Sequence, residues 1–84
     1  MRARKVLPDF LLFENLKPKF DKNSVVVHNM TGDDYVIVLH PCEDQVRLEH
    51  NGHPAYGYRA VDGDGTLWFR SVFEMDDGRF SLVP

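Results

Sequence analysis

The sequence lacks a second cysteine, so Cys42 has no partner for an intramolecular disulfide. Small secreted domains commonly depend on disulfides, and a lone cysteine therefore favours a reducing, cytoplasmic setting. The sequence also lacks an apolar run approaching the ~18 residues of a membrane-spanning helix. Its first residues, MRARKVLPDF, are basic but contain no apolar segment of signal-peptide length. We therefore expect no membrane partner.

Basic residues are scarce after residue 22. Residues 23–84 carry four Arg against ten Asp and Glu, whereas residues 1–22 carry six Lys or Arg against three acids. Nonspecific binding to nucleic acid needs many Lys and Arg contacts to phosphates, so the acidic body makes nucleic acid the less favoured partner. Residues 1–7 are expected to be a flexible tail, as chain ends commonly are.

The composition is that of one small folded domain spanning residues 1–84. Hydrophobic residues make up 43% of the chain and charged residues 27%, as in ordinary globular proteins. Short β-branched and aromatic segments alternate with turn residues, which predicts a mainly all-β fold. The six expected strands are residues 24–28, 35–40, 45–50, 55–61, 66–73 and 79–83.

Short turns between the expected strands predict an antiparallel meander that curls into a bent sheet or an SH3-like barrel. A short helix over residues 9–17 is expected to cover an open end or edge of this sheet. Asp9 is a suitable residue to cap that helix, and Pro18 would end it.

The segment Ala55–Phe73 predicts the central hairpin, because Asp62-Gly63-Asp64-Gly65 has the composition of a tight turn. A two-residue loop at Gly63-Asp64 would place Arg59 opposite Trp68. Side chains alternate between the faces of a strand, so this register assigns one face to the core. The expected core face consists of Tyr56, Tyr58, Ala60, Leu67, Phe69 and Phe73.

The opposite face of this predicted hairpin would gather Arg59, Trp68 and Arg70. A Trp beside two Arg side chains is typical of a binding hot spot. In the alternative interpretation Trp68 belongs to the core, and the aliphatic stems of the two Arg side chains cover it.

Acidic residues cluster in the expected turns. Turns favour Asp and expose it, which explains the pattern without a function. The alternative is an acidic rim that attracts a basic protein surface. Together with the hairpin face, this gives the candidate partner-binding residues Arg59, Asp62, Asp64, Trp68, Arg70, Asp76 and Asp77.

The sequence DGDGT resembles the middle of an EF-hand calcium loop, with Asp62 and Asp64 at ligand positions. The pattern fails at two other ligand positions, where Ala60 and Ser71 stand. A meander would bring His28, His50 and His53 toward one end of the sheet, which leaves a zinc site as a weaker alternative. We assign no metal and no cofactor.

No sequence motif of nucleophilic or phosphate chemistry is present. Cys42 has His40 two residues away, but a turn does not by itself supply the oriented base and third group that activate a nucleophile. We therefore expect no enzymatic activity.

Residues 68–75, WFRSVFEM, resemble the W-x-R-P-x-x-M-F ending of a family of small uncharacterised bacterial SH3-like domains. The segment departs from that pattern at Ser71, where the family has Pro. The resemblance implies an SH3-like fold.

The leading functional hypothesis is a non-enzymatic protein–protein interaction module. A compact acidic domain of this kind fits an accessory or inhibitor protein of a phage or mobile element, which occludes a larger host complex. The alternative is a small barrel that binds single-stranded nucleic acid. Its bases would stack on Trp68, Tyr56 or Tyr58 beside Arg59 and Arg70.

Overall fold

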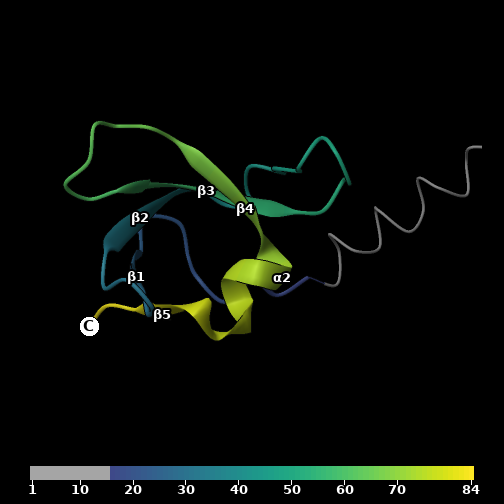
Figure 1. Cartoon of the computed structure of the whole chain (residues 1–84). Helices are drawn as coiled ribbons and strands as arrows, with labels where there is room; N and C mark the ends of the chain where they lie inside the picture. The colour runs from purple at the N-terminus through teal and green to yellow at the C-terminus, as the bar shows by residue number, and fades with distance from the viewer. Residues whose placement is uncertain (1–15) are drawn as a thin grey trace, which may run out of the picture.

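The computed structural model describes residues 16–84, and the mainly all-β class predicted from the sequence is confirmed (Figure 1). Two short helical segments, α2 (Val72–Glu74) and η1 (Met75–Arg79), join the last two strands. The five strands are β1 (Val25–His28), β2 (Asp34–Leu39), β3 (Ala55–Ala60), β4 (Trp68–Ser71) and β5 (Phe80–Leu82).

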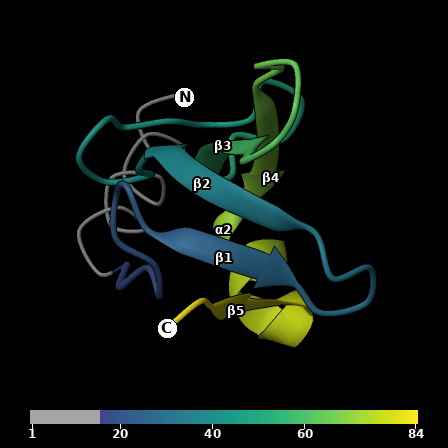
Figure 2. The same ribbon diagram turned by 90° about the vertical axis from the view of Figure 1, so that its left-hand side faces the viewer.

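The strands form one antiparallel sheet in the order β4-β3-β2-β1-β5 (Figure 2). The sheet curls into a half-barrel, so its two edge strands approach each other across the concave face. The guanidinium carbon of Arg70 on β4 lies 6.0 Å from the centroid of the Phe80 ring on β5. The ring centroids of Tyr58 and Phe80 are 5.9 Å apart. The concave face is therefore filled by side chains from both halves of the sheet.

The buried core is mainly aromatic and lies on this concave face. Tyr35 stands edge-on to Tyr58, with ring centroids 5.3 Å apart, and α2 and η1 close the base of the half-barrel. Edge-to-face packing of this kind adds to the stabilisation from burial alone. The core cluster consists of Phe20, Val26, Ile37, Tyr56, Tyr58, Val72, Met75 and Phe80.

One expected strand is not formed, and two expected segments near the N-terminus lie wholly or mostly outside the described residues. Residues 45–50 form no strand, and the segment makes only an isolated bridge between Arg47 and Pro54. Pro54 has no backbone N–H and Gln45 has a φ of 50°, so a regular ladder does not extend along this segment. The predicted tail (1–7) and most of the predicted helix (9–17) lie outside the described residues. Leu16 and Lys17 are described and are not helical.

The predicted register of the central hairpin is wrong by one residue. Tyr58 lies opposite Trp68 and Gly57 opposite Phe69, and the connection runs over residues 61–67. A two-residue loop is not formed, because the Asp64 carboxylate accepts hydrogen bonds from the Thr66 N–H (2.9 Å) and hydroxyl (2.6 Å). These bonds fold the loop back on itself before β4 begins.

A one-residue shift of register moves every side chain of a strand to the opposite face. Trp68 and Arg70 therefore share the concave face with Tyr58, whereas Phe69 lies on the convex face. The predicted core face of the hairpin is therefore wrong for part of its residues. Tyr56 and Tyr58 are buried, but Leu67, Phe69 and Phe73 are exposed.

A buried phenol joins three parts of the chain below the sheet. The Tyr56 hydroxyl accepts a hydrogen bond from the Phe20 N–H (3.1 Å) and donates one to Asp76 Oδ1 (3.0 Å). The Lys19 N–H donates to the other oxygen of that carboxylate, at 3.0 Å. These bonds connect the chain before β1, the strand β3 and the segment η1. Within residues 16–84 no helix is long and apolar enough to cross a membrane.

Candidate binding surface on strand β4

Exposed large apolar side chains gather along β4 and its two ends. Trp68 is 55% exposed, and Phe69 and Phe73 are each 47% exposed. Leu67 completes this group, which we call the β4 apolar surface. Single exposed apolar side chains are ordinary, whereas a large exposed apolar patch marks an interaction site. Trp68 and Phe69 are neighbours on β4 and point to opposite faces of the sheet, so this group lies on both sides of the β4 edge. The concentration on an edge strand therefore makes β4 the candidate functional element.

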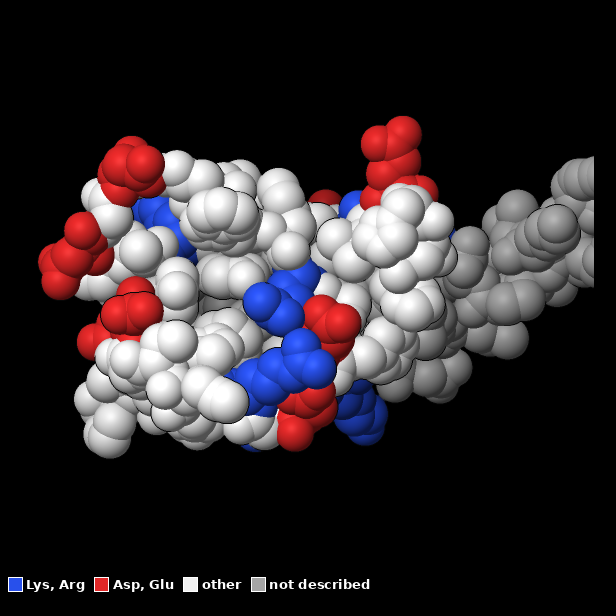
Figure 3. Space-filling model, viewed as in Figure 1, with Lys and Arg blue, Asp and Glu red and all other residues white. Residues whose placement is uncertain are grey.

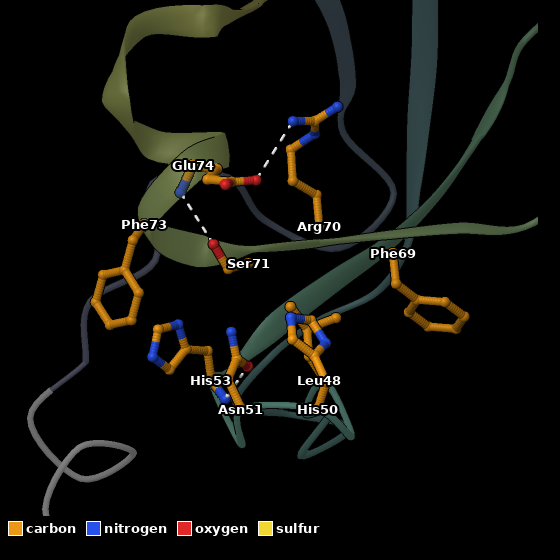
Figure 4. A pocket seen from close by; sticks show the side chains of 9 residues that line it. All are labelled: Leu48, His50, Asn51, His53, Phe69, Arg70, Ser71, Phe73 and Glu74. Carbon is orange, nitrogen blue, oxygen red and sulfur yellow. Dashed lines mark hydrogen bonds and ion pairs between the residues drawn. The ribbon is translucent and has the colours of Figure 1, made fainter.

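The convex side of β4 borders a groove of about 520 Å³ (Figure 4). Phe69, Ser71 and Phe73 form one side of this groove. The other side comes from the loop that precedes β3, and the His53 ring lies edge-on to Phe73 with centroids 5.3 Å apart. The residues that line the groove are Leu48, His50, Asn51, His53, Phe69, Arg70, Ser71, Phe73 and Glu74.

Ser71 fixes the path of the chain where β4 turns into α2. Its side-chain oxygen accepts a hydrogen bond from the Glu74 N–H at 3.2 Å and so caps the helix, as Ser commonly does. The cap sends the chain sharply away from the sheet after Ser71. Phe69 and Phe73 therefore stand at opposite ends of the groove, with Ser71 between them (Figure 4).

Arg70 projects from the other side of β4, onto the concave face (Figure 4). Its Nε donates to the Tyr58 hydroxyl at 3.4 Å, and its Nη1 lies 3.4 Å from Glu74 Oε1. The hydrogen bond to Tyr58 is the main cause of a raised pKa of Arg70, and Glu74 adds to it. The guanidinium therefore stays charged at the open mouth of the half-barrel.

The predicted grouping of Arg59 with Trp68 and Arg70 is wrong. Arg59 lies opposite Val36 on the convex face, whereas Trp68 and Arg70 lie on the concave face. The alternative interpretation of Trp68 as a core residue is also wrong, because more than half of its side chain is exposed.

The four predicted acidic binding residues occupy two separate regions of the surface. Asp62 and Asp64 lie in the loop between β3 and β4, and the Thr66 hydroxyl and N–H lower the pKa of Asp64. Asp76 and Asp77 lie in η1. Asp76 holds the Tyr56 hydroxyl, and Asp77 Oδ2 lies 3.2 Å from Arg79 Nε.

In Figure 3, acidic groups appear at the left end of the molecule, beside basic groups near the centre, and at the upper right. They do not form one continuous acidic rim in this view.

The His40 side chain has a structural role in the turn after β2. Nδ1 of His40 accepts hydrogen bonds from the N–H groups of Cys42 (3.1 Å) and Glu43 (3.2 Å), which holds the turn after β2. Burial, and then the charge of Glu43, raises the pKa of the Cys42 thiol, so the reactive thiolate is disfavoured.

The His28 ring packs edge-on to Phe80, while His50 and His53 line the β4 groove. In the part of the chain that the structure describes, no three His, Cys, Asp or Glu side chains are placed to hold one metal ion. The histidine trio considered from the sequence is therefore not brought together.

The structure also removes two of the three stacking platforms expected for nucleic acid. Tyr56 and Tyr58 are buried in the core, and Trp68 alone of the three presents an exposed ring.

Sequence reasoning missed the exposed positions of Phe69 and Phe73, and the groove between them. The exposed position of Phe69 could have been predicted from Thr66, which stands two residues after Asp64. This spacing allows the side-chain hydrogen bonds that lengthen a loop and shift the register.

Comparison with protein-family models, with curated proteins and with solved structures finds no match to this chain.

Proposed function

We propose that the chain is a non-enzymatic protein-binding module whose partner docks on the β4 apolar surface. The observation that carries the proposal is the concentration of Leu67, Trp68, Phe69 and Phe73 in one exposed segment beside a groove. Trp is enriched among interface residues that dominate binding energy, and aromatic side chains are enriched at interface centres.

The proposed mode of action is occlusion. An accessory or inhibitor protein of a phage or mobile element, acting on a larger host complex, needs a rigid surface and no catalytic centre of its own. The aromatic core and the Tyr56 hydrogen bonds support β4 as such a rigid scaffold. A cytoplasmic partner is consistent with the lone Cys42, which is stable in a reducing setting.

A pull-down from the native host lysate tests the proposal. The test variant is Trp68→Ala/Phe73→Ala. The matched control is Met30→Ala/Val61→Ala, which removes two exposed apolar side chains outside the β4 apolar surface. We expect one stoichiometric protein with the wild type and the control, and its loss with the test variant. Equal capture by both variants would place the interface elsewhere.

One observation favours the alternative of nucleic-acid binding. Trp68 and Arg70 share the concave face, where a base could stack beside a positive charge. This alternative predicts a mobility shift with single-stranded probes at low salt, and a steep loss of affinity as salt is added. A shift that Trp68→Ala abolishes would favour this alternative over a protein partner.

A further inference from the structure

We propose that the free edge of β4 adds an extended segment of the partner to the sheet, with an acidic side chain of that segment opposite Arg70. This inference rests on the proposed protein-binding function and deepens it. It names the docking mode, which is strand addition, and the chemistry of the occupant, which is an extended peptide with apolar residues around one Asp or Glu.

The hydrogen-bond pattern of β4 shows which backbone groups are available. Val72 donates its N–H to the Pro54 carbonyl at 2.9 Å, which makes the pair of residues 54 and 72 a hydrogen-bonded pair. Hydrogen-bonded and non-bonded pairs alternate along an antiparallel ladder. With the observed register, the pairs at Arg70 and Trp68 are then also bonded to β3, and the pairs at Phe69 and Ser71 are not.

It follows that the N–H and C=O of Phe69 point away from β3, at the outer edge of the sheet. The N–H of Ser71 points the same way, but Ser71 is only 5% exposed, so Phe69 supplies the accessible part of this edge. β4 is an end strand in the sheet order, so none of the described strands covers this edge. Unpaired main-chain groups on an edge strand are a ready template for another strand, and peptide recognition commonly uses such edges.

The side chains on both sides of this edge suit an extended apolar segment. Successive residues of an added strand would point alternately to the two faces. On the convex side they would meet Phe69, Phe73 and the groove of about 520 Å³. On the concave side they would meet Trp68 and Arg70, of which Arg70 is drawn in Figure 4.

Arg70 favours a partner strand that carries an acid, and it disfavours a second copy of this chain in the register that pairs Phe69 with Ser71. Pairing two β4 edges through the outward groups of Phe69 and Ser71 would centre the antiparallel ladder on Arg70. The two Arg70 side chains would then lie directly opposite each other, which is unfavourable, whereas an acidic residue in that place is favourable. Among the described residues, Arg70 contacts Tyr58 and Glu74 at 3.4 Å and lies 6.0 Å from the centre of the Phe80 ring. Both polar contacts are long, so the guanidinium can turn toward such an acid.

The probe for this proposal is a phage-displayed library of random dodecapeptides, selected against the wild-type protein. We expect the enriched peptides to alternate β-branched or apolar residues with polar ones around a single Asp or Glu. In ¹⁵N-labelled protein, a synthetic enriched peptide should shift the amide signal of Phe69 more strongly than that of Arg70. Selection of no peptide, or shifts that leave the Phe69 amide unchanged, would overturn strand addition.

Two substitutions of Phe69 distinguish the contribution of the backbone N–H at the sheet edge from that of the aromatic ring. Phe69→Ala removes the ring but keeps the N–H, whereas Phe69→Pro also removes the N–H. Proline is tolerated at an edge position whose N–H faces solvent, so the variant is expected to fold. We expect Phe69→Pro to bind the selected peptide at least about tenfold more weakly than Phe69→Ala, since it also blocks approach of the strand. Equal affinities would contradict the proposal.

A change in the peptide keeps the test decisive if Phe69→Pro fails to fold. Replacing the acidic residue of the selected peptide with Lys should weaken binding to the wild type by about fivefold or more, because like charges would then face each other across the ladder. Unchanged binding would remove the role of Arg70.

Failure of strand addition can be distinguished from failure of the proposed function. A host protein that is lost with Trp68→Ala/Phe73→Ala but retained by Phe69→Pro would overturn strand addition alone. Retention of that protein by all these variants would overturn the proposed docking surface as well.

Discussion

The ring of Phe69 lies over Gly57, the residue directly opposite it on β3. A Cβ atom placed on Gly57 would stand 3.0 Å from Phe69 Cε1 and 3.0 Å from Leu39 Cβ, which is closer than ordinary van der Waals contact. The absence of a side chain at residue 57 therefore makes room for the aromatic ring on the convex face. This contact seats one wall of the β4 groove against the sheet.

We predict that Gly57→Ala destabilises the protein by about 1–3 kcal/mol, the usual cost of forcing extra atoms into a packed site. Chemical denaturation with urea measures this loss. Part of the strain should disappear in a Phe69→Ala background, so the two substitutions should not be additive. Full additivity would show that Phe69 does not rest on Gly57.

Removal of the Tyr56 hydroxyl should also destabilise the fold. In Tyr56→Phe the buried Phe20 N–H loses its acceptor and Asp76 loses a donor. A buried donor without a partner costs about 1–3 kcal/mol, and urea denaturation should show a loss of that order. Tyr35→Phe is the matched control, because Tyr35 is a half-buried core tyrosine outside this network. A similar loss in both variants would refute the special role of Tyr56.

The same phenol should make stability depend on pH in the alkaline range. Burial is the main cause of a strongly raised pKa of Tyr56 in the folded protein, and the Asp76 carboxylate contributes to the increase. The unfolded tyrosine has a pKa of about 10. Its contribution to stability is therefore fully present below about pH 10 and is lost as the pH rises toward the folded pKa, because the unfolded chain releases the proton first.

Urea denaturation at a series of pH values above about 9 tests this linkage. The free energy of unfolding of the wild type should fall more steeply than that of Tyr56→Phe. Parallel curves for the two proteins would contradict the assignment.

The loop between β3 and β4 offers a test of the register. We predict that Thr66→Val raises the pKa of Asp64 toward its ordinary value, because the Thr66 hydroxyl is the main cause of its lowering. NMR titration of the Asp64 carboxyl carbon measures the change. Thr66→Ser keeps the hydroxyl and should keep the low pKa. An unaltered titration in Thr66→Val would mean that the loop does not close through this bond.

The sequence predicted the strands of this protein better than their pairing. The β-branched residues of Val25–His28 identify β1, and the apolar run that starts at Tyr35 identifies β2, through local preference alone. The register of β4 depends instead on how many residues the preceding loop uses. That number is set by hydrogen bonds between Asp64 and Thr66, which no hydrophobic pattern records.

The unpredicted register also explains why only some of the candidate site residues were correctly placed from the sequence. Trp68 and Arg70 were correctly placed on one face, because residues two apart in a strand always share a face. Arg59 was wrongly added to them, and Phe69 was wrongly assigned to the core, because both assignments required the register. The exposure of Phe73 depends on the Ser71 cap, which starts a helix where a longer strand was expected.

The most direct test of the account is the affinity of the captured partner for single variants, measured by isothermal titration calorimetry. Trp68→Ala should weaken binding by about 2 kcal/mol or more, which is roughly thirtyfold in Kd, as expected for a central aromatic residue. Met30→Ala removes a more exposed apolar side chain and should leave Kd unchanged. Equal affinities of Trp68→Ala and the wild type, with the fold intact, would contradict β4 as the docking surface.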